Sequence, residues 1–214
     1  MTAVVTEPVD LRDGRAPLLI TRPASSDALI DEAAFAAGDE YLPYWAELWP
    51  SAVVLARRVA AADLRGLRVL EVGCGLGLPA LAAARAGATV VATDWSADAV
   101  AAAAGNAAAA GLTGSVTCVV ADWRDPGPLV AAGPFDVVLA ADVLYEARAV
   151  APLLTLLATL NAPQVILADP SRATAEPFLA GATAVGWSIT STQAEDRPMV
   201  RVHELRRDGT AVPP

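Results

Sequence analysis

The sequence has no lysine, one histidine and two cysteines, and only 5% of its residues are aromatic. The cysteines, Cys74 and Cys118, are too few for a disulfide scaffold and lie in segments expected in the core, so we expect a reduced, cytoplasmic protein. No spacing of His, Cys and Asp residues suggests a metal site, and His203 is expected to be an ordinary strand residue. All 15 basic residues are arginine, which together with the many alanines indicates a GC-rich genome.

The sequence also lacks long apolar runs. No uninterrupted stretch reaches the ~20 residues that a membrane-spanning helix needs. The longest candidate, residues 97–112, is broken by Gly105 and Asn106 and is typical of a helix packed on a sheet. The N-terminus carries acidic residues instead of a basic region followed by an apolar one, so no secretory signal is expected. We therefore expect no membrane attachment.

Basic residues are outnumbered by acidic ones. The formal net charge of −9 disfavours long-range attraction to nucleic acid, so no nucleic-acid partner is expected. The charge is compatible with a basic partner, such as a protein that presents a lysine, although an acidic surface also serves solubility alone. The sequence is silent on assembly, and a monomer or weak dimer is the working expectation.

Strand-like and helix-like segments alternate along most of the chain. The apolar patterns predict strands at residues 67–72, 89–93, 116–121, 135–140 and 165–168. Helices are predicted at residues 78–86, 97–110, 146–160 and 173–185. Two last strands, 187–193 and 199–206, form a predicted antiparallel hairpin. The alternation predicts an α/β fold, a Rossmann-like, doubly wound, mostly parallel seven-stranded sheet with ligands at the carboxyl ends of its strands.

The N-terminal part has a weaker pattern. We expect residues 1–40 to form an extension packed on a domain of residues 41–214. The first 26 residues look irregular or weakly β, and Asp27–Ala37 has the pattern of a short helix. A further helix is expected from a Ser51 cap to about Ala62.

A glycine-rich loop follows the strand at residues 67–72, which carries the acidic Glu71 near its end. Glycine permits tight turns and close approach of a ligand, and the next helix offers free N–H groups at its start. A dinucleotide loop has the pattern Gly-x-Gly-x-x-Gly, but its third glycine position is Leu78 here. A carboxylate at Glu71 would repel a diphosphate and suits a cation, such as the amino end of S-adenosylmethionine. We expect this cofactor to contact Glu71, Gly73, Cys74, Gly75 and Gly77.

Acidic residues also follow the next two predicted strands. Asp94 lies 21 residues after Gly73, where a carboxylate can accept hydrogen bonds from ribose hydroxyls. Asp122 can accept from an adenine amino group, and the neighbouring Trp123 offers an apolar wall. Trp95 and Ala141, at the ends of their strands, are further expected cofactor contacts. The last two are Trp45 and Trp49, in the segment that precedes the sheet.

Three local sequences carry a resemblance to a known family, namely Pro43–Pro50, Asp142–Tyr145 and Asp169–Arg172. With the glycine loop, they make the chain resemble the class I, seven-stranded S-adenosylmethionine-dependent methyltransferases from Tyr41 to Arg207. More narrowly, the sequence is similar to the methyltransferase family that includes the lysine methyltransferase of the electron transfer flavoprotein β subunit. The resemblance implies S-adenosylmethionine as cofactor and a nitrogen as the methyl acceptor.

The resemblance also implies roles at the substrate end. Asp142 and Tyr145 are assigned the catalytic roles, Asp142 as the acceptor that orients an amine and Tyr145 as a wall and hydrogen-bond partner. Their spacing alone would equally fit a helix cap and a core tyrosine.

An aromatic segment precedes the first strand of the predicted sheet. If it is extended, Trp45 and Trp49 share one face and form a lid whose rings attract cations. A hydrophobic strap along the sheet edge is the alternative interpretation of the two tryptophans. Tyr44, Glu47 and Asp169 are expected to contact the substrate, although Asp169 would also fit a structural turn.

Taken together, the sequence predicts an S-adenosylmethionine-dependent N-methyltransferase that acts on a lysine side chain of a protein. A small-molecule amine is the alternative acceptor, because some bacterial relatives carry the name nicotinamide N-methyltransferase. A non-catalytic cofactor-binding module fits Asp142 and Tyr145 less well. A nicotinamide-dinucleotide oxidoreductase fits Glu71 and Leu78 less well.

Overall fold

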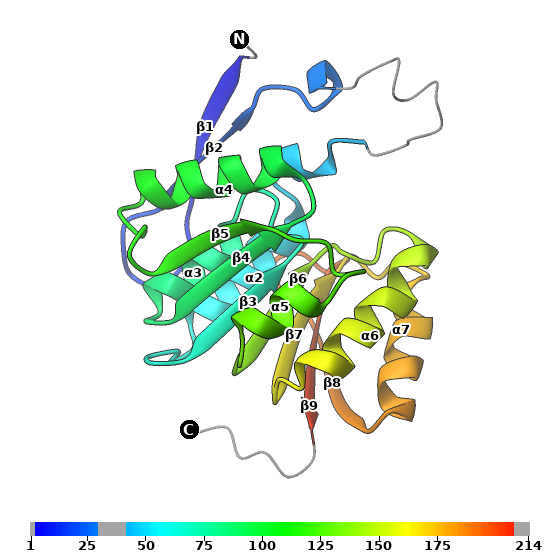
Figure 1. The fold of residues 1–214 in the computed structure, drawn as a ribbon. Helices are drawn as coiled ribbons and strands as arrows, with labels where there is room; N and C mark the ends of the chain where they lie inside the picture. The colour runs from blue at the N-terminus through cyan, green and yellow to red at the C-terminus, as the bar shows by residue number, and fades with distance from the viewer. Residues whose placement is uncertain (1–2, 30–41, 208–214) are drawn as a thin grey trace.

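A seven-stranded sheet forms the centre of the protein, as a computed structural model that describes residues 3–29 and 42–207 shows (Figure 1). The strand order is β5-β4-β3-β6-β7-β9-β8, with β9 antiparallel to both of its neighbours and the first five strands parallel. The strands are β3 Arg68–Val72, β4 Thr89–Asp94, β5 Val116–Val120, β6 Val137–Ala141, β7 Gln164–Asp169, β8 Trp187–Gln193 and β9 Arg201–Arg207. The predicted fold class is confirmed.

Helices cover both faces of this sheet (Figure 1). One face packs against helices α2, α3 and α4, and the other against α5, α6 and α7. The helices are α2 Pro50–Ala60, α3 Leu78–Arg85, α4 Ala97–Ala109, α5 Gly127–Ala132, α6 Val150–Leu160 and α7 Ala175–Ala184.

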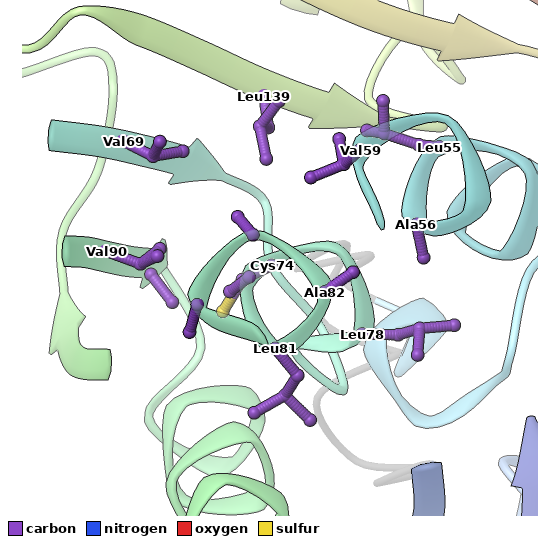
Figure 2. Close-up of a cluster of buried hydrophobic side chains, with 14 of the residues drawn as sticks. Leu55, Ala56, Val59, Val69, Cys74, Leu78, Leu81, Ala82, Val90 and Leu139 are labelled. Atoms are coloured by element: carbon purple, nitrogen blue, oxygen red, sulfur yellow. The ribbon is translucent and has the colours of Figure 1, made fainter. Parts of the chain in front are cut away.

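Alternation along the strands divides the core in two. Val69 faces the layer of α2 and α3, whereas the adjacent Leu70 faces the layer of α6 and α7, because successive strand side chains point to opposite faces. Figure 2 shows the first layer, where strand residues meet α2 and α3 in a cluster that includes Leu55, Leu81 and Leu139. Both layers are mainly apolar, and several buried polar residues, among them Asp94, Asp142 and Asp169, lie at or just after strand ends.

Three expectations about local structure were wrong or incomplete. Helix α2 begins at Pro50 with Trp49 as its N-cap, so Ser51 lies inside the helix and does not cap it. Helix α5 was not expected, because it is short and begins with a Gly-Pro pair that is typical of a loop. Of the helix expected at Asp27–Ala37, the turn η1 Asp27–Leu29 is present, and residues 30–37 lie outside the described residues.

The N-terminal segment forms a regular hairpin where irregular or weakly β structure was expected. Strands β1 Val4–Val9 and β2 Leu18–Pro23 pair antiparallel in a separate two-stranded sheet beside α4 (Figure 1). The buried amide of Asn106 in α4 accepts from the Thr21 N–H (2.9 Å) and donates to the Thr21 carbonyl (3.2 Å). It also donates to the Leu76 carbonyl in the glycine loop (3.0 Å). One side chain thus connects the hairpin, α4 and that loop.

Substitution of two glycines, one packed on α4 and one inside it, should have opposite effects on stability. Gly77 has φ +80°, and a Cβ there would lie 2.9 Å from the Cβ of Ala103, so Gly77→Ala should cost about 2 kcal/mol or more of unfolding free energy. Gly105 lies exposed inside α4 with nothing within 4 Å of an added Cβ, so Gly105→Ala should gain about 0.5–1 kcal/mol. Urea denaturation of both variants measures the difference, and equal midpoints would contradict the close packing of Gly77 on α4.

Candidate active site

A pair of adjoining cavities opens at the carboxyl ends of β3, β4 and β6, where the strand order reverses and open α/β sheets bind their ligands. The first cavity has a volume of about 310 Å³ and the second about 300 Å³. Both are lined by Gly73, Trp95, Trp123, Tyr145 and Glu146, so the two cavities share a wall.

Most of the residues predicted from the sequence line the first cavity. They are Tyr44, Trp45, Glu47, Trp49, Glu71, Gly73, Cys74, Gly75, Asp94, Trp95, Trp123, Ala141, Asp142 and Tyr145. Three predicted residues lie elsewhere. Asp122 lines the second cavity, Gly77 packs on α4, and Asp169 is buried behind the cavity wall.

The glycine loop is packed too closely against its neighbours to accommodate side chains at two of its positions. Gly73 has φ +66°, and a Cβ there would lie 2.9 Å from Cγ1 of Val143 and 3.5 Å from the Trp123 ring. Gly75 has φ +48°, and its Cβ would lie 3.3 Å from the Trp45 carbonyl oxygen. The two glycines also line the first cavity, so the loop presents its backbone there without side chains, as a ligand cradle requires.

Two buried carboxyl groups flank this loop. Oε2 of Glu71 accepts a hydrogen bond from the Ala80 N–H in the first turn of α3 (2.8 Å), and burial raises the pKa of Glu71 well above its usual value. Asp94 accepts from the N–H groups of Gly75 and Ser96 (3.0 Å each), and burial raises the pKa of Asp94 as well. A cationic ligand in the cavity would favour the charged form of both groups, so the pair suits a cation.

The second cavity has aromatic and charged walls. Trp95 is largely exposed and Trp123 is half-buried, and both border it. The carboxylate of Asp122 is held by Arg124, whose Nε lies 2.9 Å from Oδ1 and 2.7 Å from Oδ2, and this hydrogen bonding keeps the pKa of Asp122 below its usual value. Arg124 therefore competes with any ligand amino group for Asp122.

Asp142 follows β6 in a left-handed backbone conformation, with φ +58°. Its side chain is 6% exposed. Oδ1 accepts from Nε (2.9 Å) and Nη2 (2.6 Å) of Arg172, and Oδ2 accepts from the hydroxyl of Ser51 (3.2 Å). Such a conformation is costly for a residue with a side chain and is typical of functional sites. The 3-10 turn η3 Ala147–Ala149 follows, with Glu146 as its N-cap, and leads into α6, so Asp142 does not cap a helix here.

Ser51 and Arg172 are two contacts of Asp142 that the sequence analysis missed. Ser51 was assigned a capping role, and Arg172 was noted only as part of a local motif. Their approach to Asp142 depends on the packing of α2 and of the β7–α7 loop against β6. The available signal was the position of Arg172 directly after a strand end, where other site residues also lie.

Aromatic rings border the first cavity beside Asp142. The Tyr44 ring lies 5.2 Å from that of Tyr145 and 6.2 Å from that of Trp49, and Nε1 of Trp49 donates to the Tyr44 carbonyl (2.7 Å). The expectation of an extended segment was wrong, because Tyr44–Ala46 forms the 3-10 turn η2. Trp45 lines the cavity from this turn and Trp49 from the N-cap of α2, so strand alternation is not what brings them together.

The two other carboxylates expected near the substrate differ in their surroundings. Glu47 is about one-third exposed, lines the cavity and lies 3.3 Å from Nη1 of Arg22, which comes from the N-terminal hairpin. Asp169 is fully buried. Its Oδ1 accepts from the Arg172 N–H (2.7 Å), its Oδ2 has no hydrogen-bond partner among the described residues, and burial raises the pKa of Asp169.

Within residues 3–29 and 42–207, no cluster of His, Cys, Asp and Glu side chains could hold a metal ion. The helices of the same described ranges are all too short or too polar to cross a bilayer.

The strand order, the glycine loop after β3 and the carboxylates after β3, β4 and β6 define a class I S-adenosylmethionine-dependent methyltransferase. Solved structures with this fold include a ribosomal protein L11 methylase from Lactobacillus delbrueckii, 24% identical, covering 73% of this chain and 78% of that chain, with a TM-score of 0.58. Magnesium protoporphyrin IX methyltransferase from Synechocystis with bound S-adenosylmethionine is 22% identical. The match covers 86% of this chain and 98% of that chain, with a TM-score of 0.57. A TehB-like methyltransferase from Corynebacterium glutamicum is 16% identical. The match covers 86% of this chain and 98% of that chain, with a TM-score of 0.58.

The chain belongs to the lysine methyltransferase family, whose model matches residues 44–180. No curated protein matches the chain in sequence. The site fits the cofactor of this class, because S-adenosylmethionine carries an ammonium, a sulfonium and ribose hydroxyls, and the cavity offers buried carboxyl groups beside a close backbone cradle. The protein is therefore a methyltransferase that uses S-adenosylmethionine.

Proposed function

We propose that this enzyme methylates the side-chain nitrogen of a lysine in a protein substrate. The observation that carries the proposal is the buried carboxylate of Asp142 in an aromatic-bordered cavity that also contains the glycine loop. Among the described residues, the cavity lining contains five carboxyl groups and one guanidinium, that of Arg172, which suits cationic reactants. The carboxyl groups belong to Glu47, Glu71, Asp94, Asp142 and Glu146.

The cofactor end of the proposed site is formed by the glycine loop and its carboxyl groups. When bound, S-adenosylmethionine supplies a methyl group on a positively charged sulfur. We infer that Glu71 neutralises a ligand ammonium and that Asp94 accepts from ribose hydroxyls through its remaining lone pairs. Trp95 and Trp123 offer flat apolar walls for an adenine ring on the side of the second cavity.

At the acceptor end, the amine must lose a proton before it can attack, because a free lysine has a pKa of about 10.4. The acceptor nitrogen forms a bond to the methyl carbon while the carbon–sulfur bond breaks, leaving its electron pair on sulfur. The proton that the ammonium loses before the attack would pass to Oδ2 of Asp142, and the product would leave as a methylammonium. Tyr44, Trp49 and Tyr145 would enclose the aliphatic stem and exclude water, which keeps the nitrogen aimed at the methyl group.

A small-molecule amine is the second candidate acceptor. Structural neighbours include enzymes named for small molecules, such as magnesium protoporphyrin IX methyltransferase, beside one named for a ribosomal protein. A cavity of about 310 Å³ could also enclose a small ring that carries a nitrogen. We rank the protein acceptor first because the family model describes lysine methyltransferases.

A methyl-labelling experiment distinguishes these acceptors. Purified enzyme is incubated with a cell lysate and S-adenosylmethionine labelled in its methyl group, and label is followed in protein bands and in the small-molecule fraction. We expect label in one or a few protein bands, with methyl-lysine after acid hydrolysis. Because the chain has no lysine, its own band provides an internal control that should stay free of methyl-lysine. Label confined to small molecules would overturn the protein-lysine proposal.

A further inference from the structure

Arg172 is the one basic side chain among the described residues that line the first cavity. It lies between β7 and α7, and its side chain is 34% exposed. Two of its N–H groups, on Nε and Nη2, donate to the same oxygen, Oδ1 of Asp142. A carboxylate oxygen has two lone pairs, so this fork occupies the accepting capacity of Oδ1.

The loop that carries Arg172 is fixed by hydrogen bonds to three other parts of the chain. The Arg172 N–H donates to the buried Asp169, and the Ser171 hydroxyl donates to the Met199 carbonyl (3.1 Å). Thr174 donates through its hydroxyl to the Leu144 carbonyl, close to the segment that contains Asp142. The guanidinium is therefore delivered to Asp142 from a well-anchored backbone.

The two oxygens of Asp142 have different partners as a result. Oδ1 is occupied by Arg172, whereas Oδ2 accepts one hydrogen bond, from Ser51, and retains a free lone pair. The carboxylate is held between α2 and the β7–α7 loop and cannot turn without losing these contacts. One defined oxygen thus remains to accept an N–H from a substrate.

We propose that Arg172 is a positioning residue for methyl transfer, which holds Asp142 with Oδ2 free for the acceptor amine and whose positive charge disfavours the protonated form of that amine. This inference rests on the proposed N-methylation. Its electrostatic part follows because a nearby like charge lowers the pKa of an ammonium. The opposing carboxyl groups are the cavity-lining Glu47, Glu71, Asp94, Asp142 and Glu146, with Asp169 behind them, and the cavity also contains the phenols of Tyr44 and Tyr145.

Two variants separate the geometry of Arg172 from its charge. Arg172→Lys keeps the charge but loses the fork, so we expect kcat to fall about 10-fold, with no shift in the acidic limb of the kcat pH profile, which reports ionisations in the enzyme–substrate complex. Arg172→Gln loses both, so we expect a fall of about 30-fold and a limb displaced upward by about one pH unit, because the amine pKa rises when the like charge is removed. Arg65→Gln removes an exposed charge before the amino end of β3, away from the carboxyl ends where the cavities open, and should change neither.

Binding of S-adenosylhomocysteine, measured by calorimetry, reports on folding and on the cofactor end independently of turnover. We expect all three variants to stay within about threefold of the unmodified enzyme, because Arg172 touches the acceptor side. The inference would be overturned if the pH profile of Arg172→Gln superimposed on that of the unmodified enzyme. It would also be overturned if the acidic limb moved as far in Arg172→Lys as in Arg172→Gln. A variant that fails to bind S-adenosylhomocysteine would equally contradict a role confined to the acceptor. If the unmodified enzyme methylates no amine, it is the proposed function that fails.

Discussion

Asp142→Asn should lower the rate of methyl transfer about a thousandfold while the affinity for S-adenosylhomocysteine stays within about threefold. Asparagine fits the same space but cannot take a proton from the acceptor nitrogen. It also leaves the guanidinium of Arg172 without a countercharge in a largely buried position, which adds to the loss. Single-turnover kinetics with a labelled methyl group measure the chemical step, and calorimetry measures cofactor binding.

The matched control for this substitution is Asp98→Asn, which makes the same chemical change on an exposed residue in the first turn of α4. It should leave turnover within about twofold. Turnover of Asp142→Asn within threefold of the unmodified enzyme would remove Asp142 from the reaction. If Asp142→Asn lost as much affinity for S-adenosylhomocysteine as it lost turnover, Asp142 would act in cofactor binding instead.

Glu71→Gln should weaken cofactor binding by about 10- to 100-fold, because a hydrogen bond between charged groups contributes about 1.5–3 kcal/mol. Glutamine can still accept from the Ala80 N–H through its amide oxygen, so the start of α3 should stay intact. The substitution removes the negative charge that a ligand ammonium needs. Unchanged affinity would contradict the role proposed for Glu71.

The pH dependence of binding provides a second measurement on the same variant. Burial raises the pKa of Glu71, so in the free protein this carboxyl retains its proton above its usual pH range. A cation binds the carboxylate form, so affinity should increase as the pH rises through this raised pKa, with release of a proton. Calorimetry in buffers of different ionisation enthalpy detects that proton. In Glu71→Gln the released fraction should fall, and the remainder should come from Asp94, whose pKa is also raised.

Local patterns were sufficient to predict most of the sheet and the cofactor end of the site. The residues that follow β3 and β4 could be predicted from local sequence, because a strand, a glycine loop and the start of a helix are contiguous along the chain. Glu71, Gly73 and Asp94 were found in this way. The two-sided burial of β6 likewise follows from its apolar run, which has no polar alternation.

What sequence reasoning missed depends on contacts between distant segments. Ser51 and Arg172 meet Asp142 across 91 and 30 positions, and the Thr21–Asn106 contact spans 85. A polar residue in an alanine-rich helix gives no sign of its partner, so Asn106 was interpreted only as an interruption. The 3-10 turn at Tyr44–Ala46 was missed because alternating aromatics indicate a strand when packing is unknown.

The position of Asn106 has a consequence for the opening motions of the molecule. Its amide shares hydrogen bonds between the hairpin strand β2 and the carbonyl of Leu76, so the hairpin cannot detach without leaving buried polar groups unpaired. Local unfolding of the hairpin and loosening of the cofactor loop are thus joined in one cooperative unit. Ligand occupancy at the sheet should then slow amide exchange in the first twenty-odd residues, far along the chain from any group that touches the ligand.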